Sequence, residues 1–414
     1  MVLTITRLLL RLFVALALGL SAPGASAQTA RPDANPEISL ITFGPGEIYW
    51  ERFGHNALLV LERSRDAATV YNYGIFDFEQ KNFFLNFARG KMMYRVAEEP
   101  YSRALLPYAY EGRWAVQQKL ALTPGQAREL RDFLKWNLRP ENVEYHYDYF
   151  IANCSTKVRD AIDSVLDGAL RSQLEALPAG TTYRREVTRL TAAESWLMLG
   201  MDVALGPAAD VPVNVWEDAF VPMKLMNALR GVQIDDGKGG SRPLVAEEVS
   251  LLPQRAAIES ATPPDLRLPF ALAGLLFAAL VLGLGCVRSR KPARVAFSLL
   301  ADTFSLITGL AGLVLLAFWL LTDHWPAWHN LNLLLLNPLA LILLPTWVRA
   351  GFSGWHPSSR AYLLGCLLGL AALLVTVLAA TPLAPQQNLQ WALLLAPSHV
   401  VLGWCLYRRR AQAS

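Results

Sequence analysis

Charged residues are scarce in this chain of 414 residues: they make up 17% of it, against about 25% in an ordinary soluble domain. Hydrophobic residues reach 53%, and this composition excludes a disordered, collagen-like or coiled-coil protein. The deficit of charge lies at the C-terminal end, because residues 269–414 contain only 11 charged side chains. Residues 28–268 have 27 basic and 32 acidic residues, a net charge of −5. Without a basic surplus there, we expect no nucleic-acid partner.

Metal-binding spacings are also missing. The histidines and carboxylates form no His-Glu-x-x-His pattern and the four cysteines form no closely spaced pair, so we expect neither a metal nor a cofactor. Cys286, Cys366 and Cys405 fall within or beside apolar runs, which leaves Cys154 as the only thiol in residues 28–268. A lone thiol in an oxidising compartment is either buried and inert or kept reduced for chemistry.

The apolar runs define a topology. Arg7 and Arg11, an apolar run at 12–20 and Ala25-Ser26-Ala27 have the order of a secretory signal peptide over residues 1–27. Later runs long enough to span a bilayer lie at 269–287, 297–321, 331–348, 361–380 and 391–407. Lys and Arg occur in alternate connections and at 408–410, and are absent from 322–330 and 381–390. The positive-inside rule then predicts a cytoplasmic C-terminus and a periplasmic N-terminal domain at a bacterial inner membrane.

Between these segments we expect an α+β domain at residues 28–230 and a mobile linker at 231–268, followed by a transmembrane domain of five helices at 269–414. Strands are predicted at 38–43, 56–62 and 69–76, and helices at 124–138, 191–206 and 214–229. Twelve aromatic residues lie between residues 71 and 114. We expect most of them in the core and a minority to line a groove for an apolar substrate.

The segment Asn153-Cys154-Ser155-Thr156 precedes a run with apolar residues on one helical face. Asn153 is a predicted N-cap, which puts Cys154 in the first turn of a helix, where the partial positive charge of free N–H groups lowers the pKa of a thiol. The polar neighbours favour a nucleophile over an inert core thiol. A thiol nucleophile needs a base, and the domain offers His55 at the start of a strand and His146 eight positions before Cys154. Spacing does not choose between them.

Several segments together resemble the periplasmic domain of the Lnb-type lipoprotein N-acyltransferases: Gly54-His55-Asn56-Ala57-Leu58, Tyr71-Asn72-Tyr73-Gly74-Ile75-Phe76-Asp77-Phe78, Glu111-Gly112-Arg113 and Tyr147-Asp148-Tyr149-Phe150 with Asn153-Cys154-Ser155-Thr156. The resemblance covers most of residues 37–230 and extends weakly to the membrane part through Asp323-His324, Asn330-Leu331-Asn332 and Asn337-Pro338. The order of histidine before cysteine is also similar to circularly permuted papain-like (NlpC/P60-like) enzymes, among them permuted cell-wall peptidases and lecithin:retinol acyltransferase relatives. That resemblance selects His55 over His146.

The resemblance implies an acyltransferase that acts on bacterial lipoproteins carrying diacylglycerol and on membrane lipid. Cys154 would hold the acyl chain as a thioester and pass it to the N-terminal amine, giving a lyso-form lipoprotein. His55 would take the thiol proton, Asn72 or Asp148 would orient His55, and backbone N–H groups near Cys154 would form an oxyanion hole. Substrate contacts are expected from six further residues: Asn153, Tyr73, Arg113, His324, Asn330 and Asn332.

Two other functions stay open at this point. One is a membrane-tethered periplasmic cysteine amidase or peptidase that acts on the cell wall, although a tether needs one helix rather than five. The other is a non-catalytic envelope sensor or assembly factor, for which Cys154→Ala would leave function intact. Two of the expected contacts also have structural alternatives, since His324 can be an interfacial anchor and Arg113 can form a surface ion pair.

Overall fold

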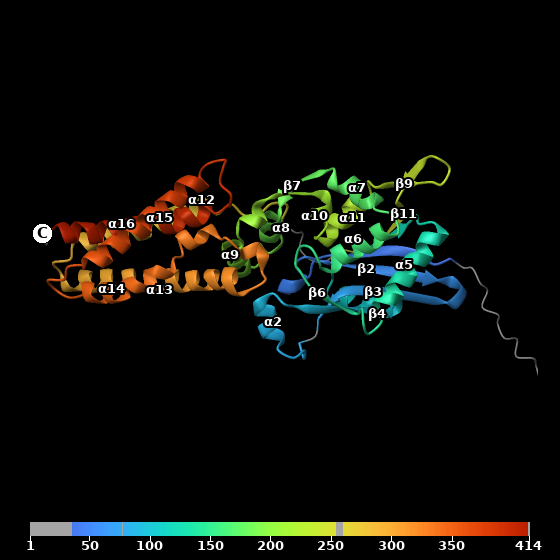
Figure 1. Ribbon diagram of the computed structural model, residues 1–414, viewed down its shortest axis with the longest axis horizontal. Helices are drawn as coiled ribbons and strands as arrows, with labels where there is room; N and C mark the ends of the chain where they lie inside the picture. The colour runs from blue at the N-terminus through green and yellow to red at the C-terminus, as the bar shows by residue number, and fades with distance from the viewer. Residues whose placement is uncertain (1–34, 77, 254–259, 413–414) are drawn as a thin grey trace, which may run out of the picture.

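The computed structural model describes residues 35–76, 78–253 and 260–412. The expected signal peptide at 1–27 therefore lies outside the described residues. The molecule is elongated, with a mixed α/β domain at one end and a bundle of long helices at the other (Figure 1). The C-terminal helix ends on the side of the bundle away from the α/β domain.

Seven strands of the described residues form one antiparallel sheet in the order β11-β5-β1-β2-β3-β4-β6. The three predicted strands are confirmed as β1, β2 and β3. Side chains on β1 alternate between the two faces, as the two-residue period of a strand requires: Leu40 and Phe43 belong to different core clusters. The strand bounds are β1 Glu37–Phe43, β2 His55–Glu62, β3 Ala67–Ile75, β4 Met93–Pro100, β5 Ala115–Leu120, β6 Glu144–His146 and β11 Val245–Leu252.

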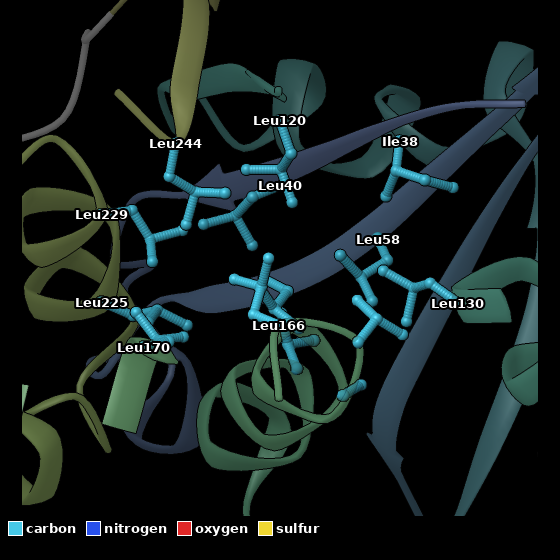
Figure 2. Close-up of a cluster of buried hydrophobic side chains, with 14 of the residues drawn as sticks. Ile38, Leu40, Leu58, Leu120, Leu130, Leu166, Leu170, Leu225, Leu229 and Leu244 are labelled. Atoms are coloured by element: carbon cyan, nitrogen blue, oxygen red, sulfur yellow. The ribbon is translucent and has the colours of Figure 1, made fainter. Parts of the chain in front are cut away.

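Helices cover both faces of the sheet. The larger core lies between β1 and β2 and the helices α5, α6, α7 and α11, and it includes Leu58, Leu130 and Leu225 (Figure 2). The opposite face is covered by α3 and α4. The helix bounds are α2 Phe83–Arg89, α3 Tyr101–Ala104, α4 Leu106–Tyr110, α5 Pro124–Asn137, α6 Cys154–Ser164, α7 Ala169–Glu175, α8 Tyr183–Leu190, α9 Ser195–Ala204, α10 Val215–Asp218 and α11 Pro222–Leu229.

Three expectations about local structure need correction. The helix expected from residue 191 begins only at Ser195, and the helix expected at 214–229 is divided into α10 and α11, with Pro222 as the first residue of the second. The segment 231–268 is not only a linker, because β11 joins the main sheet beside β5. Its smaller strands, β9 Gln233–Asp235 and β10 Ser241–Pro243, pair with each other, as do β7 Pro178–Thr182 and β8 Pro212–Asn214.

Five apolar segments of the described residues are long enough to cross a membrane, as the sequence predicted: Arg267–Cys286, Lys291–Leu321, Leu331–Ala350, Ser359–Ala379 and Leu389–Ala411. Four of them are the continuous helices α12, α13, α15 and α16. The third is interrupted: two short 3-10 helices, Leu331–Leu334 and Pro338–Leu343, precede α14 Leu344–Ala350. Pro338 and Pro345 lack the N–H that a continuous helix needs, which explains the breaks.

Candidate active site

Cys154 is the first residue of α6, and Asn153 is its N-cap, as predicted. The Asn153 Oδ1 accepts hydrogen bonds from the N–H groups of Ser155 and Thr156, both 2.9 Å long. The Lys157 N–H is bonded to the Asn153 carbonyl. Of the N–H groups in the first turn of α6, the one belonging to Cys154 is thus left to bind something else.

A chain of hydrogen bonds orients His55, which is the first residue of β2. The imidazole Nε2 is 3.0 Å from the Asn72 Oδ1, and the Asn72 Nδ2 donates to the Glu99 Oε1 at 2.9 Å. Since Glu99 fixes which end of the Asn72 amide is the donor, the Oδ1 faces the imidazole as an acceptor and Nε2 carries the proton. Nδ1 is then the basic nitrogen, and it has no hydrogen-bond partner among the described residues.

Cys154 lies beside the strands that carry His55 and Asn72. Pairing between β2 and β3 ends at Ala57 and Asn72, so the strands separate just beyond this pair. A Cβ placed on Gly74 of β3 would lie 3.3 Å from the Cys154 Cβ, so the absence of a side chain at Gly74 lets the start of α6 approach the strand. The thiol is also within hydrogen-bond range of the N–H of Asn56, the residue that follows His55.

A second set of polar contacts connects β2 to α6 at the same level. The Asn56 Nδ2 donates to the Ser155 Oγ at 3.0 Å, and the Ser155 Oγ donates to the Ala219 carbonyl at 2.6 Å. Both side chains are fully buried. Because Asn56 follows His55 and Ser155 follows Cys154, this hydrogen bond fixes the position of one candidate catalytic residue relative to the other.

Burial sets the charge state of the pair. It lowers the pKa of His55 to about 4, against the smaller opposing effect of the Asn72 hydrogen bond. It also raises the pKa of the Cys154 thiol, outweighing the N–H groups of Asn56, Ser155 and Cys154 and the nearby Arg113 cation, all of which favour the thiolate. The prediction that the helix N-terminus lowers the pKa of this thiol is therefore wrong, because burial outweighs it, and thiol and imidazole are both neutral at rest.

Arg113 is buried rather than on the surface, which corrects the expected surface ion pair. Its Nε donates to the Gly44 carbonyl at 2.7 Å, and its Nη1 lies 3.2 Å from Glu111 and 3.6 Å from Glu51. The guanidinium also lies over the Tyr108 ring, 4.7 Å from its centroid. Its Nε and Nη1 are thus engaged by the protein, and the guanidinium acts on the pair as a nearby positive charge.

The structure does not bring His146 or Asp148 to His55. His146 is exposed at the end of the edge strand β6. The Asp148 Oδ1 accepts from the N–H groups of Phe150 and Ile151, and its Oδ2 accepts from the Trp325 Nε1 at 2.7 Å. Asp148 therefore connects the segment before Cys154 to the loop between α13 and the third span, and Asn72 is the residue that orients the imidazole.

Two side chains near Cys154 were expected to contact substrate; one is fully hydrogen-bonded to the protein and the other is buried. Asn153 uses its amide on the carbonyls of Tyr149 and Phe220 as well as on the first turn of α6. Tyr73 is buried with its ring 6.2 Å from that of Tyr145, and its hydroxyl has no partner among the described residues. Neither side chain faces solvent.

The remaining expected contacts, which lie in the membrane part, form a joint with the α/β domain. The Asn330 Nδ2 donates to the carbonyls of Val203, Ala204 and Leu205, and the Asn332 Nδ2 donates to that of Val203. Both asparagines are buried. They bind the carbonyls that α9 leaves unpaired at its C-terminal end, and contact of either with a substrate stays a prediction.

His324 also contacts the α/β domain. Its Nε2 is 3.0 Å from the Phe87 carbonyl at the end of α2, and its ring stacks on Tyr149 with centroids 6.0 Å apart. Burial lowers the pKa of His324. This residue therefore belongs to the contact between the membrane loop and the domain.

Glu99, Asn56 and Gly74 were missed from the sequence. A pairing pattern that set Glu99 opposite Val70 would have brought it next to Asn72, but the strand at 93–100 was not predicted. Asn56 and Gly74 do stand inside the quoted motifs, where their positions beside His55 and Asn72 were a signal. Where the structure describes the chain, no three His, Cys, Asp or Glu side chains gather to hold a metal ion.

Comparison with known families gives two matches. Residues 28–189 match the Lnb N-terminal periplasmic domain, and residues 262–410 match the Lnb transmembrane domain. No curated protein and no solved structure matches the chain. The circularly permuted papain-like arrangement therefore stays a prediction, whereas the mixed α/β domain followed by five apolar helices is what the structure has.

Proposed function

Because the chain belongs to the Lnb family, we propose that this membrane protein with a periplasmic N-terminal domain is a thiol acyltransferase. It moves a fatty acyl chain through Cys154 to the N-terminal amine of a diacylglyceryl-modified lipoprotein and yields a lyso-form. The membrane is the bacterial inner membrane, and the C-terminus is cytoplasmic. The alternating Lys and Arg content of the connections supports this orientation.

The arrangement of His55, Asn72 and Glu99 beside Cys154 is the observation that carries the proposal. The hydrogen bond from Nε2 to Asn72 leaves Nδ1 as the basic nitrogen. A nucleophile next to a base that is oriented by a third group is the arrangement required for covalent catalysis. The low pKa of His55 keeps the base unprotonated at neutral pH.

In the first half of the reaction, the Cys154 sulfur attacks the ester carbonyl while the imidazole Nδ1 takes the thiol proton. The N–H of Cys154, which the Asn153 side chain does not bind, stabilises the oxyanion that forms. When the intermediate collapses, the C–O bond breaks, and His55 returns the proton to the departing glyceryl oxygen. The products of this half are an S-acyl thioester on Cys154 and a lipid with a free hydroxyl.

In the second half, the lipoprotein amine attacks the thioester carbonyl and His55 accepts a proton from the nitrogen. The C–S bond breaks, an amide forms, and the proton passes to the sulfur to restore the thiol. A neutral thiol and imidazole suit this cycle, because no standing thiolate is exposed to other electrophiles between turnovers.

The contacts with the membrane loop support a substrate that lies in the bilayer. Trp325 donates to Asp148, six residues before Cys154, and His324 stacks on Tyr149. The segment leading to the candidate nucleophile is thus held by the loop that follows α13, so Cys154 is coupled to the membrane part of the chain.

Mass spectrometry of lipoprotein N-termini tests the proposal in cells that depend on this chain. We expect lyso-form N-acylation with the native protein, none with Cys154→Ser or His55→Ala, and native levels with the control Cys286→Ser. Unchanged N-acylation with Cys154→Ser would exclude this mechanism. Loss of cell-wall peptide cleavage instead of N-acylation would identify the amidase alternative.

A further inference from the structure

An exposed aromatic surface lies at the end of the α/β domain nearest the membrane helices. We define it as the aromatic patch, and its members are Trp50, Phe76, Phe78, Phe83, Phe84, Leu85 and Phe87. The sequence favoured a core position for most aromatics of this region, but Phe84 is 74% exposed, and Phe78, Leu85 and Phe87 are also exposed. An exposed apolar patch of this kind on a folded domain marks an interaction surface.

The rings of the aromatic patch form a continuous group across three segments. Phe76 and Phe78 lie 5.0 Å apart, and both lie near Trp50 on one side and Phe83 on the other, at centroid distances of 5.1 to 6.4 Å. Phe83 contacts Phe84 and Phe87 within α2. The patch is therefore built by packing between segments and is not a set of isolated side chains.

The aromatic patch lies beside the lipid-facing end of α13, and this position indicates that lipid covers the patch. The Asp323 N–H donates to the Arg89 carbonyl at 2.8 Å, and Gly90, which ends α2, packs against the backbone of Asp323 and His324. Leu321, the last residue of α13, is 74% exposed on an apolar membrane span. The short helix α2 lies next to this end of the bundle (Figure 1), so the aromatic patch continues the surface that faces lipid.

We propose that α2 is an interfacial helix and that the aromatic patch is seated among the lipids of the outer leaflet. The helix has no acidic residue and ends on Arg89, with Lys81 before it and Lys91, which pairs with Asp323, after it. Basic residues beside an apolar helix face are typical of helices that bind an anionic membrane surface. Aromatic side chains are also the residues enriched at the boundary between lipid headgroups and acyl chains. This proposal, which we call the lipid seat of the aromatic patch, does not depend on acyl transfer.

The aromatic contacts continue from the patch toward Cys154. Phe76 is 5.4 Å from Tyr94, which stacks on Tyr147 at 4.1 Å. Burial first, and then the neighbouring Cys154, raise the pKa of Tyr147. If acyl transfer is the reaction, this row of packed rings places the aromatic patch on the same side of the domain as the sulfur.

Site-directed spin labelling of the full chain tests the lipid seat. A nitroxide is attached at Phe84→Cys, with Phe78→Cys and Phe87→Cys as further positions and Trp136→Cys as the matched control. Trp136 is also exposed, at 46%, but ends α5, which lies far from the bundle (Figure 1). All labels are placed in one background without native cysteines: Cys154→Ser, Cys286→Ser, Cys366→Ala and Cys405→Ala.

The protein is placed in nanodiscs of phosphatidylethanolamine and phosphatidylglycerol, and collisions with oxygen and with nickel ethylenediaminediacetate are compared. We expect the ratio of oxygen to nickel collisions to be several-fold higher on the patch than at position 136. Equal ratios would mean that the patch faces water and would overturn the proposal. Labels shielded from both probes would mean that protein covers the patch, which overturns it as well. Neither result bears on N-acylation by Cys154, so failure of the two proposals is distinguishable.

Discussion

Two polar clusters of this molecule differ in how many of their hydrogen-bonding groups are used. At the joint between the domain and the membrane helices, Arg184 donates from all three nitrogens, to Asp202, to Asp210 and to the carbonyls of Asp202, Leu205 and Gly206. At the candidate active site, the Nδ1 of His55 has no hydrogen-bond partner in the described part of the chain.

The difference separates structural residues from chemical ones. A buried group with all its partners holds two parts of the chain together, whereas the half-buried imidazole of His55 keeps a nitrogen open at which a ligand or a proton donor can bind. Both clusters include residues that the sequence nominated for the site. The two asparagines differ in what they bind: Asn330 binds the carbonyls at the end of α9, whereas Asn72 binds the imidazole of His55.

The largest expected effect concerns the joint. Arg184→Met leaves the carboxylates of Asp202 and Asp210 without their buried cation, and breaking such a pair costs about 3–5 kcal/mol of stability. We expect a clearly lower thermal unfolding midpoint by tryptophan fluorescence in detergent, with N-acylation retained per folded molecule at lower temperature. Arg185→Met, on the exposed side of the same helix, is the control. Equal midpoints for the two variants would show that the network does not hold the joint.

Next in size is the loss of the orienting amide. Asn72→Ala removes the acceptor that fixes the imidazole, and loss of an outer-shell orienting partner typically reduces activity by about 10–100-fold. We expect this loss in the rate of thioester formation without a change in the unfolding midpoint.

Two further variants separate orientation from packing at position 72. Glu99→Gln keeps an acceptor for the Asn72 Nδ2 and should retain most activity. Asn72→Asp places a negative charge beside His55 and should move the acidic limb of the pH profile to higher pH. If the pH profile of activity did not move with Asn72→Asp, the side chain at position 72 would contribute packing and not the orientation of His55.

A smaller effect is expected in thiol reactivity. Because burial raises the pKa of Cys154 above its ordinary 9.0, the thiolate is a minor species at pH 7, and its fraction grows about tenfold per pH unit. Alkylation by iodoacetamide, followed on the Cys154 peptide by mass spectrometry, should therefore keep rising beyond pH 9. If the alkylation rate instead reached a plateau below pH 8, Cys154 would be a thiolate at neutral pH. The thiol and the imidazole would then not form a neutral pair.

The rate of thioester formation should be limited at acidic pH rather than at alkaline pH. His55 is neutral above its pKa of about 4 and is protonated below it, so the rate should fall only as the pH falls through about 4. In the iodoacetamide experiment on Cys154, the exposed Cys286 of the same chain serves as the internal reference for alkylation.

Periodic and local patterns were enough to predict part of this structure. The Thr123 and Gln126 capping box starts α5 where expected, Asn153 caps α6, and the apolar runs match the spans. Contacts between distant segments were not predictable, because they depend on strand pairing. Glu99 reaches Asn72 only through the ladder between β3 and β4, and Asp148 reaches Trp325 across 177 positions. Those long-range contacts decide which polar side chains have hydrogen-bond partners for all their donors and acceptors.

The smallest expected effect concerns His146, which sequence spacing alone could not separate from His55. It is exposed at the end of the edge strand β6, paired with Met93, whereas the base that we propose beside Cys154 is His55. His146→Ala should therefore leave both thioester formation and N-acylation within about twofold of the native protein, as for a surface substitution far from the chemistry. His55→Ala measured in parallel shows that the assay detects the loss of a base. A large loss with His146→Ala would mean that the edge strand moves to Cys154 during turnover, and that saturation in the resting structure does not identify the base.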